Sequence, residues 1–185
     1  MGVIYMKILN FGSLNIDYVY SVDHFVQKGE TISSSQMNIF SGGKGLNQST
    51  ALGRAGAQVF HAGRIGKGGE FLVEQLKEAG VNTDLVVLDS QCSTGHAIIQ
   101  NDAEGDNCIL LYGGANQRIT KEQIDATLDQ FDAGDYLVLQ NETSNLPYLM
   151  EKAAEKQMKI VLNPSPMDEK IKALPLDKVT LFFVN

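Results

Sequence analysis

Apolar and polar residues follow two rhythms along this chain, and each rhythm predicts a type of element. Short and almost wholly apolar runs, bounded by glycine or polar residues, are typical of strands buried on both faces, as in a parallel sheet. Apolar residues at helical spacing lie between these runs and predict amphipathic helices. The predicted strands are 7–11, 58–64, 136–140, 159–162 and 179–184, and the predicted helices are 45–55, 70–79 and 147–157.

A further helix is predicted after residue 120 because its start is marked in several ways. Thr120 is a candidate N-cap, and Gln123 completes a capping box. Ile119 and Ile124 fit a hydrophobic staple around that cap, and later apolar residues recur on the face of Ile124. Strand–helix alternation at both ends of the chain therefore predicts an α/β fold. Its parallel βαβ units would form a mostly parallel sheet flanked by helices.

Two stretches break this alternation and predict a separate layer. Residues 17–22 and 32–40 are rich in β-favouring side chains on either side of a glycine turn. Three further strands, at 84–89, 95–100 and 107–112, have no helix between them. We therefore expect one α/β domain over 1–185, with a small antiparallel β layer formed by the inserted segments of about 17–40 and 84–113.

Composition narrows the classes of function. The net charge of −7 argues against nucleic acid as a partner, since phosphate backbones require basic surfaces. The sequence has neither an apolar run long enough to span a membrane nor a signal-peptide pattern, so no membrane partner and a cytoplasmic location are expected. Cys92 and Cys108 match no metal spacing, and the three histidines are scattered, so no metal-ligand cluster is expected.

Residues 41–48, Ser-Gly-Gly-Lys-Gly-Leu-Asn-Gln, form the most specific motif. Glycines and a following helix suit an oxygen-rich ligand, because helix N-termini offer free N–H groups. This is not a Walker A loop, because Lys44 is followed by Gly45. Asn47 and Gln48 suit hydroxyl groups as well as phosphate. A buried lysine among glycines is rare unless it is paired, which favours a binding role over a bare loop-to-helix junction.

Other candidates follow predicted strands. Asn15 and Asp17 offer donors and acceptors that suit neighbouring sugar hydroxyls, although both residue types also favour turns. Glu142 lies near the carboxyl end of a strand, where ligands bind in α/β folds, and could equally be a solvated loop acid. Asn163 precedes a proline and is read as a structural turn. Asp135 precedes a strand, at the end opposite to ligands, and is rejected as catalytic.

At these residues the sequence resembles the ribokinase or PfkB family of carbohydrate kinases, and the ribokinase branch most closely. The resemblance covers nearly the whole chain and implies a ribokinase-like α/β fold with a β lid. Residues 42–49 with Gly56 and Gly66 fit the amino-terminal motif of the family at its full spacing. Further segments that resemble family motifs, in order, are 12–17, 29–31, 93–95, 104–107 and 113–116.

The resemblance also implies roles for single residues. Asn185 would approach the nucleotide phosphates and the metal. The lid would pair two copies into a homodimer, and the cofactors would be ATP, Mg²⁺ and a monovalent cation such as K⁺. The residues implied to contact the sugar are Asn15, Asp17, Gly42, Gly43, Lys44, Asn47 and Glu142.

No catalytic residue is assigned within these 185 residues. In the family the general base lies in a Gly-Ala-Gly-Asp element, which also forms the anion hole. We expect that element, with most of the nucleotide and cation sites, beyond Asn185. The expectation is therefore a fragment or truncated protein. It would be the sugar-binding part of an ATP-dependent kinase acting on a sugar hydroxyl, and it would be inactive alone.

Two alternatives stay open. The first is a kinase for another substrate, such as fructose, 2-keto-3-deoxygluconate or a nucleoside. A nucleoside would call for an aromatic platform, for which Tyr18, Phe40 and Tyr112 are candidates. The second is a non-catalytic module that binds a sugar or dimerises through its lid.

Overall fold

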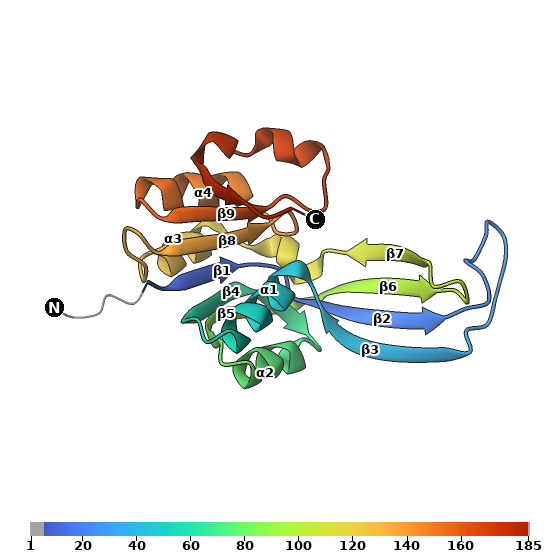
Figure 1. The fold of residues 1–185 in the computed structure, drawn as a ribbon. Helices are drawn as coiled ribbons and strands as arrows, with labels where there is room; N and C mark the ends of the chain where they lie inside the picture. The colour runs from blue at the N-terminus through green and yellow to red at the C-terminus, as the bar shows by residue number, and fades with distance from the viewer. Residues whose placement is uncertain (1–5, 185) are drawn as a thin grey trace.

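The computed structural model describes residues 6–184 as an α/β body with a second, smaller sheet extending from it to the right in Figure 1. All neighbouring strands of the larger sheet are parallel. In spatial order the strands are β10 (Val179–Phe182), β9 (Lys159–Asn163), β8 (Tyr136–Gln140), β1 (Ile8–Phe11), β4 (Val59–Lys67) and β5 (Asn82–Ser93). The strand β1 lies in the interior of this sheet, between β8 and β4.

Helices cover the two faces of this sheet. From β1 the chain winds toward one edge, and from β8 it winds toward the other, so right-handed crossovers place the helices on opposite faces. Each face has its own apolar core: Leu9 and Phe11 of β1 pack with α3 and α4, whereas Leu46 and Leu72 belong to the core beneath α1 and α2. The helices are α1 (Lys44–Arg54), α2 (Glu70–Glu78), α3 (Lys121–Leu128) and α4 (Leu146–Glu155), with short 3-10 helices η1 (Gly114–Arg118), η2 (Glu169–Ala173) and η3 (Leu176–Lys178).

The smaller sheet is the expected lid, but its pairing is mixed and the expectation of an antiparallel layer was wrong. Its strands β2 and β6 are parallel neighbours, whereas the β2–β3 and β6–β7 pairs are antiparallel. The chain runs outward from the body along β2 and again along β6, so these two neighbours are parallel. It returns to the body along β3 and along β7, so each of these is antiparallel to the strand before it. The strand order is β3 (Gln36–Gly42), β2 (Asn15–Ser21), β6 (Gly95–Asn101) and β7 (Asn107–Tyr112).

The segment 84–113, expected in the lid as a whole, divides between the two sheets. Strand β5 pairs in parallel with β4 along the edge of the larger sheet, and only β6 and β7 enter the lid. The helix α2 that precedes β5 is its crossover from β4, so β4, α2 and β5 form one βαβ unit. The sequence pattern hid this unit because β5 runs directly into β6.

The helix start at Thr120 is confirmed. The Thr120 side chain accepts a hydrogen bond from the Gln123 backbone N–H at 3.2 Å, and Ile119 and Ile124 are buried beside it. The Gln123 side chain does not return to the cap as a capping box requires. Its amide donates to the Gly63 carbonyl at 2.9 Å instead, which ties α3 to β4.

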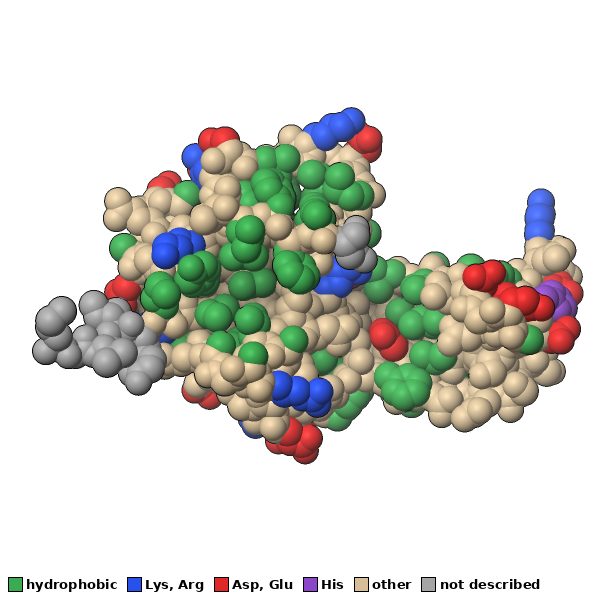
Figure 2. All heavy atoms as spheres, in the orientation of Figure 1, with side chains coloured by type: hydrophobic (Ala, Val, Ile, Leu, Met, Phe, Trp, Pro, Cys, Tyr) green, Lys and Arg blue, Asp and Glu red, His purple; other side chains and the backbone are tan. Residues whose placement is uncertain are grey.

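Apolar surface is concentrated in two places, visible in Figure 2 on the lid and where α1 borders β8 and β9. At the second place a groove of about 360 Å³ is open to solvent. The apolar side chains that line the groove are Ala51, Leu52, Val138, Val161 and Phe183.

Among residues 6–184, no helix is both long and apolar enough to cross a membrane.

Candidate functional site

A buried carboxylate marks the point where the carboxyl ends of β1 and β8 meet the start of α1. The Glu142 side chain is 6% exposed and lies two residues after β8. Its Oε1 accepts from Lys44 Nζ at 2.9 Å, and its Oε2 accepts from the Lys44 backbone N–H at 3.0 Å and from the Ser13 hydroxyl. The charge is thus compensated by a cation and by one of the free N–H groups at the helix start.

The lysine of the glycine motif is not buried, contrary to the sequence-based expectation. The Lys44 side chain is 39% exposed even though its ammonium is paired with Glu142. An ammonium has three donors, and the ion pair occupies one of them. Lys44 can therefore bind a ligand oxygen without giving up its partner.

The glycines of the motif allow close approach of backbone and side chains. Gly43 is the N-cap of α1 with φ of 94°, a left-handed conformation that favours glycine. A Cβ on Gly42 would lie 2.1 Å from Oδ2 of Asp17, and a Cβ on Gly45 would lie 2.3 Å from the Ser13 backbone nitrogen. These contacts fix where the Asp17 carboxylate and the helix start can lie.

Asp17 lies on β2, half-buried, beside this ion pair. Burial raises the pKa of Asp17 above its usual value, the Glu142 carboxylate raises it further, and the Lys44 ammonium opposes both. Among residues 6–184, its carboxylate has no hydrogen-bond partner. A half-buried acceptor of this kind can receive hydroxyl protons from a ligand.

Replacing Asp17 with asparagine is expected to stabilise the protein at neutral pH. The folded-state pKa of Asp17 lies above its unfolded value of 3.8, so the folded state binds more protons in that interval. Stability is therefore lost as pH rises from 3.8 through the raised pKa, and the loss persists at neutral pH. Urea unfolding should show Asp17→Asn more stable than wild type at pH 7. The difference should shrink toward pH 4, and equal stability at pH 7 would contradict this account.

A cleft of about 320 Å³ adjoins the carboxylate. Asn15 and Glu142 line it from the lid and from the body, and Asn116 and Gln117 of η1 line it between them. Sequence reasoning assigned no role to these two η1 residues or to Ser13. For Asn116 a signal existed, because it ends the Gly-Gly-Ala-Asn segment, which was matched as a motif without a function.

The remaining candidates lie elsewhere. Asn47 is exposed on α1 and, with Asn163, lines the separate apolar groove. The Asn163 side chain accepts from the Ser165 N–H at 2.9 Å, consistent with a turn. The Asp135 carboxylate accepts from the Lys7 N–H at 2.9 Å, at the amino end of β8. Asn185 lies outside the described residues.

A buried polar cluster supports the start of α1 from below. The Asn10 amide nitrogen donates to the Gly45 carbonyl and to the Ser49 hydroxyl, each at 2.8 Å, and Ser49 Oγ lies 2.7 Å from His61 Nδ1. Gln140 donates to the Asn10 side-chain oxygen at 2.9 Å. Burial lowers the pKa of His61 to about 4, so its ring is neutral at pH 7. The cluster joins β1, β4 and β8 to the helix that carries Lys44.

No metal centre is formed by the described part of the chain. Among residues 6–184, no group of three or more His, Cys, Asp or Glu side chains could hold a metal ion. The residue that the resemblance assigns to the nucleotide and metal, Asn185, is outside this range.

Comparison with known proteins identifies the fold. A ribokinase from Staphylococcus aureus is 34% identical over 181 residues, which are 95% of this chain and 58% of that relative's own length. The crystal structure of ribokinase from Thermotoga maritima superposes with a TM-score of 0.85 at 31% identity, over 98% of this chain and 60% of that one. A ribokinase from Cryptococcus neoformans in complex with ADP gives a TM-score of 0.81 at 35% identity, over 97% of this chain and 56% of that one.

Both superpositions extend over nearly all of this chain, which comprises the body and the lid, so the fold is the ribokinase-like α/β fold. The chain spans somewhat more than half of the length of these relatives. The family model for pfkB family carbohydrate kinases matches residues 6–185. The chain therefore belongs to the pfkB family of carbohydrate kinases.

Proposed function

We propose that this chain is the sugar-binding part of an ATP-dependent carbohydrate kinase, with ribose as the first substrate to test. The observation that carries the proposal is the convergence of acceptors and donors around the buried Glu142 carboxylate. Neighbouring sugar hydroxyls need such a mixture, because each hydroxyl both donates and accepts. The residues proposed to bind the sugar are Asn15, Asp17, Gly42, Gly43, Lys44 and Glu142. Asn47, for which the resemblance implies the same role, lines the separate apolar groove and would have to reach the sugar from there.

In this proposal the residues present orient the sugar. Asp17 and Glu142 accept hydroxyl protons, Lys44 donates, and the glycines bring the α1 backbone close to the ligand. Holding a hydroxyl in one orientation contributes to catalysis by removing rotational freedom before the reaction. The ADP-bound relative supports ATP as the phosphate donor. Mg²⁺, K⁺, a general base outside these 185 residues and a cytoplasmic location belong to the same proposal.

Calorimetric titration of the purified 185-residue chain with ribose tests this proposal. We expect saturable binding that Glu142→Ala abolishes, because the variant removes the common partner of Ser13 and Lys44. In a parallel assay with ATP and Mg²⁺, we expect ribose phosphorylation at least about a thousandfold below the 1–10³ s⁻¹ of ordinary enzymes. Turnover in that ordinary range would refute the inactivity of the isolated chain. Wild-type chain that binds no sugar from a panel including fructose would refute the sugar site.

A nucleoside substrate has less support. Asp17 pairs with Phe40 across the lid, so their side chains share a face of the sheet. Tyr18 and Tyr112 project from the opposite face, where both lie against His96. Of the three aromatic candidates, Phe40 alone lies on the Asp17 face.

The lid is proposed to pair two copies into a homodimer. Many of its apolar side chains are exposed, and every residue of β7 is exposed. An exposed apolar sheet favours association with a second sheet. A monomer in sedimentation velocity at micromolar concentration would count against this pairing.

A further inference from the structure

Asn116 is a buried side chain that contacts the sugar-side residue Asn15. It lies in η1 and is 1% exposed. Its Oδ1 accepts from the Leu14 backbone N–H at 3.0 Å. Its Nδ2 donates to the Leu14 carbonyl at 3.2 Å and to Asn15 Oδ1 at 2.8 Å. One amide thus holds both the backbone and the side chain of the turn after β1.

These contacts fix the orientation of both amides by chemistry. A backbone N–H can only donate, so the Asn116 atom facing Leu14 N–H must be the oxygen. The NH₂ group of Asn116 must then face Asn15, which in turn must present its own oxygen to Asn116. The NH₂ group of Asn15 is left on the other side.

That NH₂ group faces the cleft. Asn15 is 4% exposed and lines the cleft beside Glu142. Among residues 6–184, its Nδ2 has no hydrogen-bond partner. Among the described residues, Nδ2 of Asn15 is not one of the fully buried polar atoms left without a partner, so it is accessible from the cleft and can donate to a ligand oxygen there.

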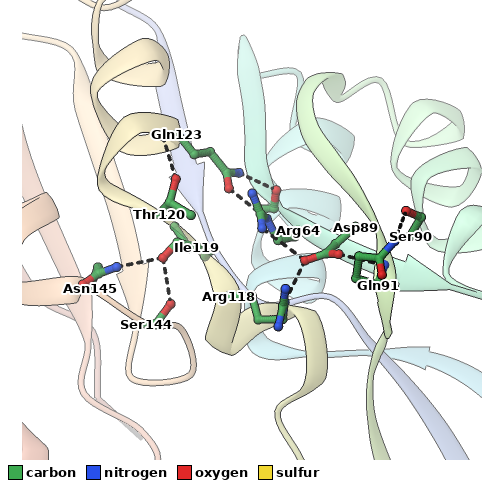
Figure 3. Close-up of polar contacts among 11 residues, drawn as sticks. Arg64, Asp89, Ser90, Gln91, Arg118, Ile119, Thr120, Gln123, Ser144 and Asn145 are labelled. Carbon is green, nitrogen blue, oxygen red and sulfur yellow. Dashed lines mark hydrogen bonds and ion pairs between the residues drawn. The ribbon is translucent and has the colours of Figure 1, made fainter.

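The helix η1 that carries Asn116 is held on both sides. The Gln117 side chain donates to the Glu142 carbonyl at 2.8 Å. Arg118 Nε donates to Asp89 Oδ2 at 2.8 Å, and the same oxygen accepts from Arg64 at 3.2 Å, as Figure 3 shows. The hydrogen bond from Arg118, and after it that from the Gln91 backbone N–H, lower the pKa of Asp89 to about 2, so this anchor stays charged at neutral pH.

Gly95 of β6 packs closely against both amides. A Cβ on Gly95 would lie 2.3 Å from Asn116 Nδ2 and 2.4 Å from Asn15 Oδ1. The pair is thus enclosed by β6 as well as by the turn after β1. A rigid support of this kind holds a ligand-binding side chain in one rotamer.

We propose that Asn116 is a positioning residue that makes Asn15 a hydrogen-bond donor toward one oxygen of the substrate. The inference rests on the proposed sugar site and adds a selectivity to it. At the sugar position that accepts the hydrogen bond from Asn15, the site binds a hydroxyl, whose oxygen has lone pairs. It rejects the corresponding amino sugar, whose ammonium can only donate.

Asn116→Asp tests the inference with almost no change in shape. One oxygen of the new carboxylate keeps the Leu14 N–H bond, and the other faces Asn15 in place of the NH₂ group. Asn15 must then turn its NH₂ toward that carboxylate and its oxygen toward the cleft. We expect ribose affinity to fall about 10- to 100-fold, the effect of one unmade hydrogen bond in a buried site.

The discriminating readout is a calorimetric panel of ribose and its monoamino analogues. In wild type, one analogue should bind much more weakly than the others. In Asn116→Asp, the penalty at that same position should shrink at least about tenfold relative to the other positions. Asn15→Asp, which presents an acceptor to the cleft without altering Asn116, should give the same position-specific change and covers the case in which Asn116→Asp does not fold. A uniform loss across the panel in both variants would overturn the proposal.

A sugar-free measurement separates this inference from the proposed function. In NMR hydrogen exchange of the wild-type chain, the Asn116 NH₂ protons should exchange slowly and the Asn15 NH₂ protons should exchange fast. A protected Asn15 NH₂ group would refute the orientation whether or not ribose binds. Normal protection without binding of any sugar would sink the proposed function and leave the orientation in place.

Discussion

Replacing Gly42 with alanine is expected to lower ribose affinity at least about 100-fold while the fold is retained. The new Cβ would lie 2.1 Å from Oδ2 and 2.4 Å from Oδ1 of Asp17, so the carboxylate must move by about 1 Å or more to restore an ordinary contact. The fold can tolerate this because the clash is with a rotatable side chain. The φ of Gly42 also lies outside the left-handed region that favours glycine. Calorimetric titration with ribose, together with thermal unfolding, measures both effects.

Gly105→Ala is the control for glycine replacement in general. Gly105 lies in the lid loop with φ of 90°, and a Cβ added to it would meet no atom within 4 Å, so alanine costs only about 1 kcal/mol of backbone strain there. Ribose affinity should be unchanged in this variant. If Gly42→Ala binds ribose as tightly as Gly105→Ala, the Asp17 carboxylate does not set the sugar position.

Gly45→Ala is expected to destabilise the protein by about 3 kcal/mol, the upper end of overpacking effects. Its Cβ would lie 2.3 Å from the Ser13 backbone nitrogen and 2.5 Å from the Gly12 carbonyl carbon. Both are backbone atoms, so relief requires α1 to move away from the turn after β1. Such a shift would also strain the buried bond from Asn10 to the Gly45 carbonyl.

Gly56→Ala provides the matched control just beyond the same helix. Gly56 has φ of 82°, and a Cβ added to it would meet no atom within 4 Å, so the expected loss there is about 1 kcal/mol. Urea denaturation with a common m-value gives both free energies of unfolding. Equal losses in the two variants would mean that close contact between α1 and β1 contributes nothing specific.

The parts of the fold with local signals were predictable. The strand Tyr136–Gln140 was predicted to the residue, because it is apolar except for Gln140 at its end and polar residues bound it. The start of α3 followed from Thr120 and its neighbours, whose contacts lie within a few residues of one another. The lid was found from β-favouring residues, but its pairing was not. The parallel pairing of β2 with β6 joins segments that are far apart in the sequence, and it depends on where each of them leaves the larger sheet.

Some residues of the candidate site could also be proposed from the sequence, whereas others could be found only in the structure. The glycine motif and Asp17 carry residue types with recognisable chemistry, so they could be proposed from sequence. Ser13 and Asn116 act through partners 129 and 101 residues away, and no local pattern reveals such contacts. The exposure of Lys44 was also missed, because a lysine at a helix start can snorkel past the backbone while keeping its ion pair.

The central place of β1 has a consequence for biosynthesis. The strand β1 pairs with β4 on one side and with β8, whose Tyr136 lies opposite Ile8, on the other. During translation the core around Leu9 and Phe11 therefore cannot close until β8 has been made, and contacts of such long range slow folding. The Glu142 carboxylate, which completes the proposed sugar cleft, follows β8 directly, so this cleft can form only once β8 has joined β1.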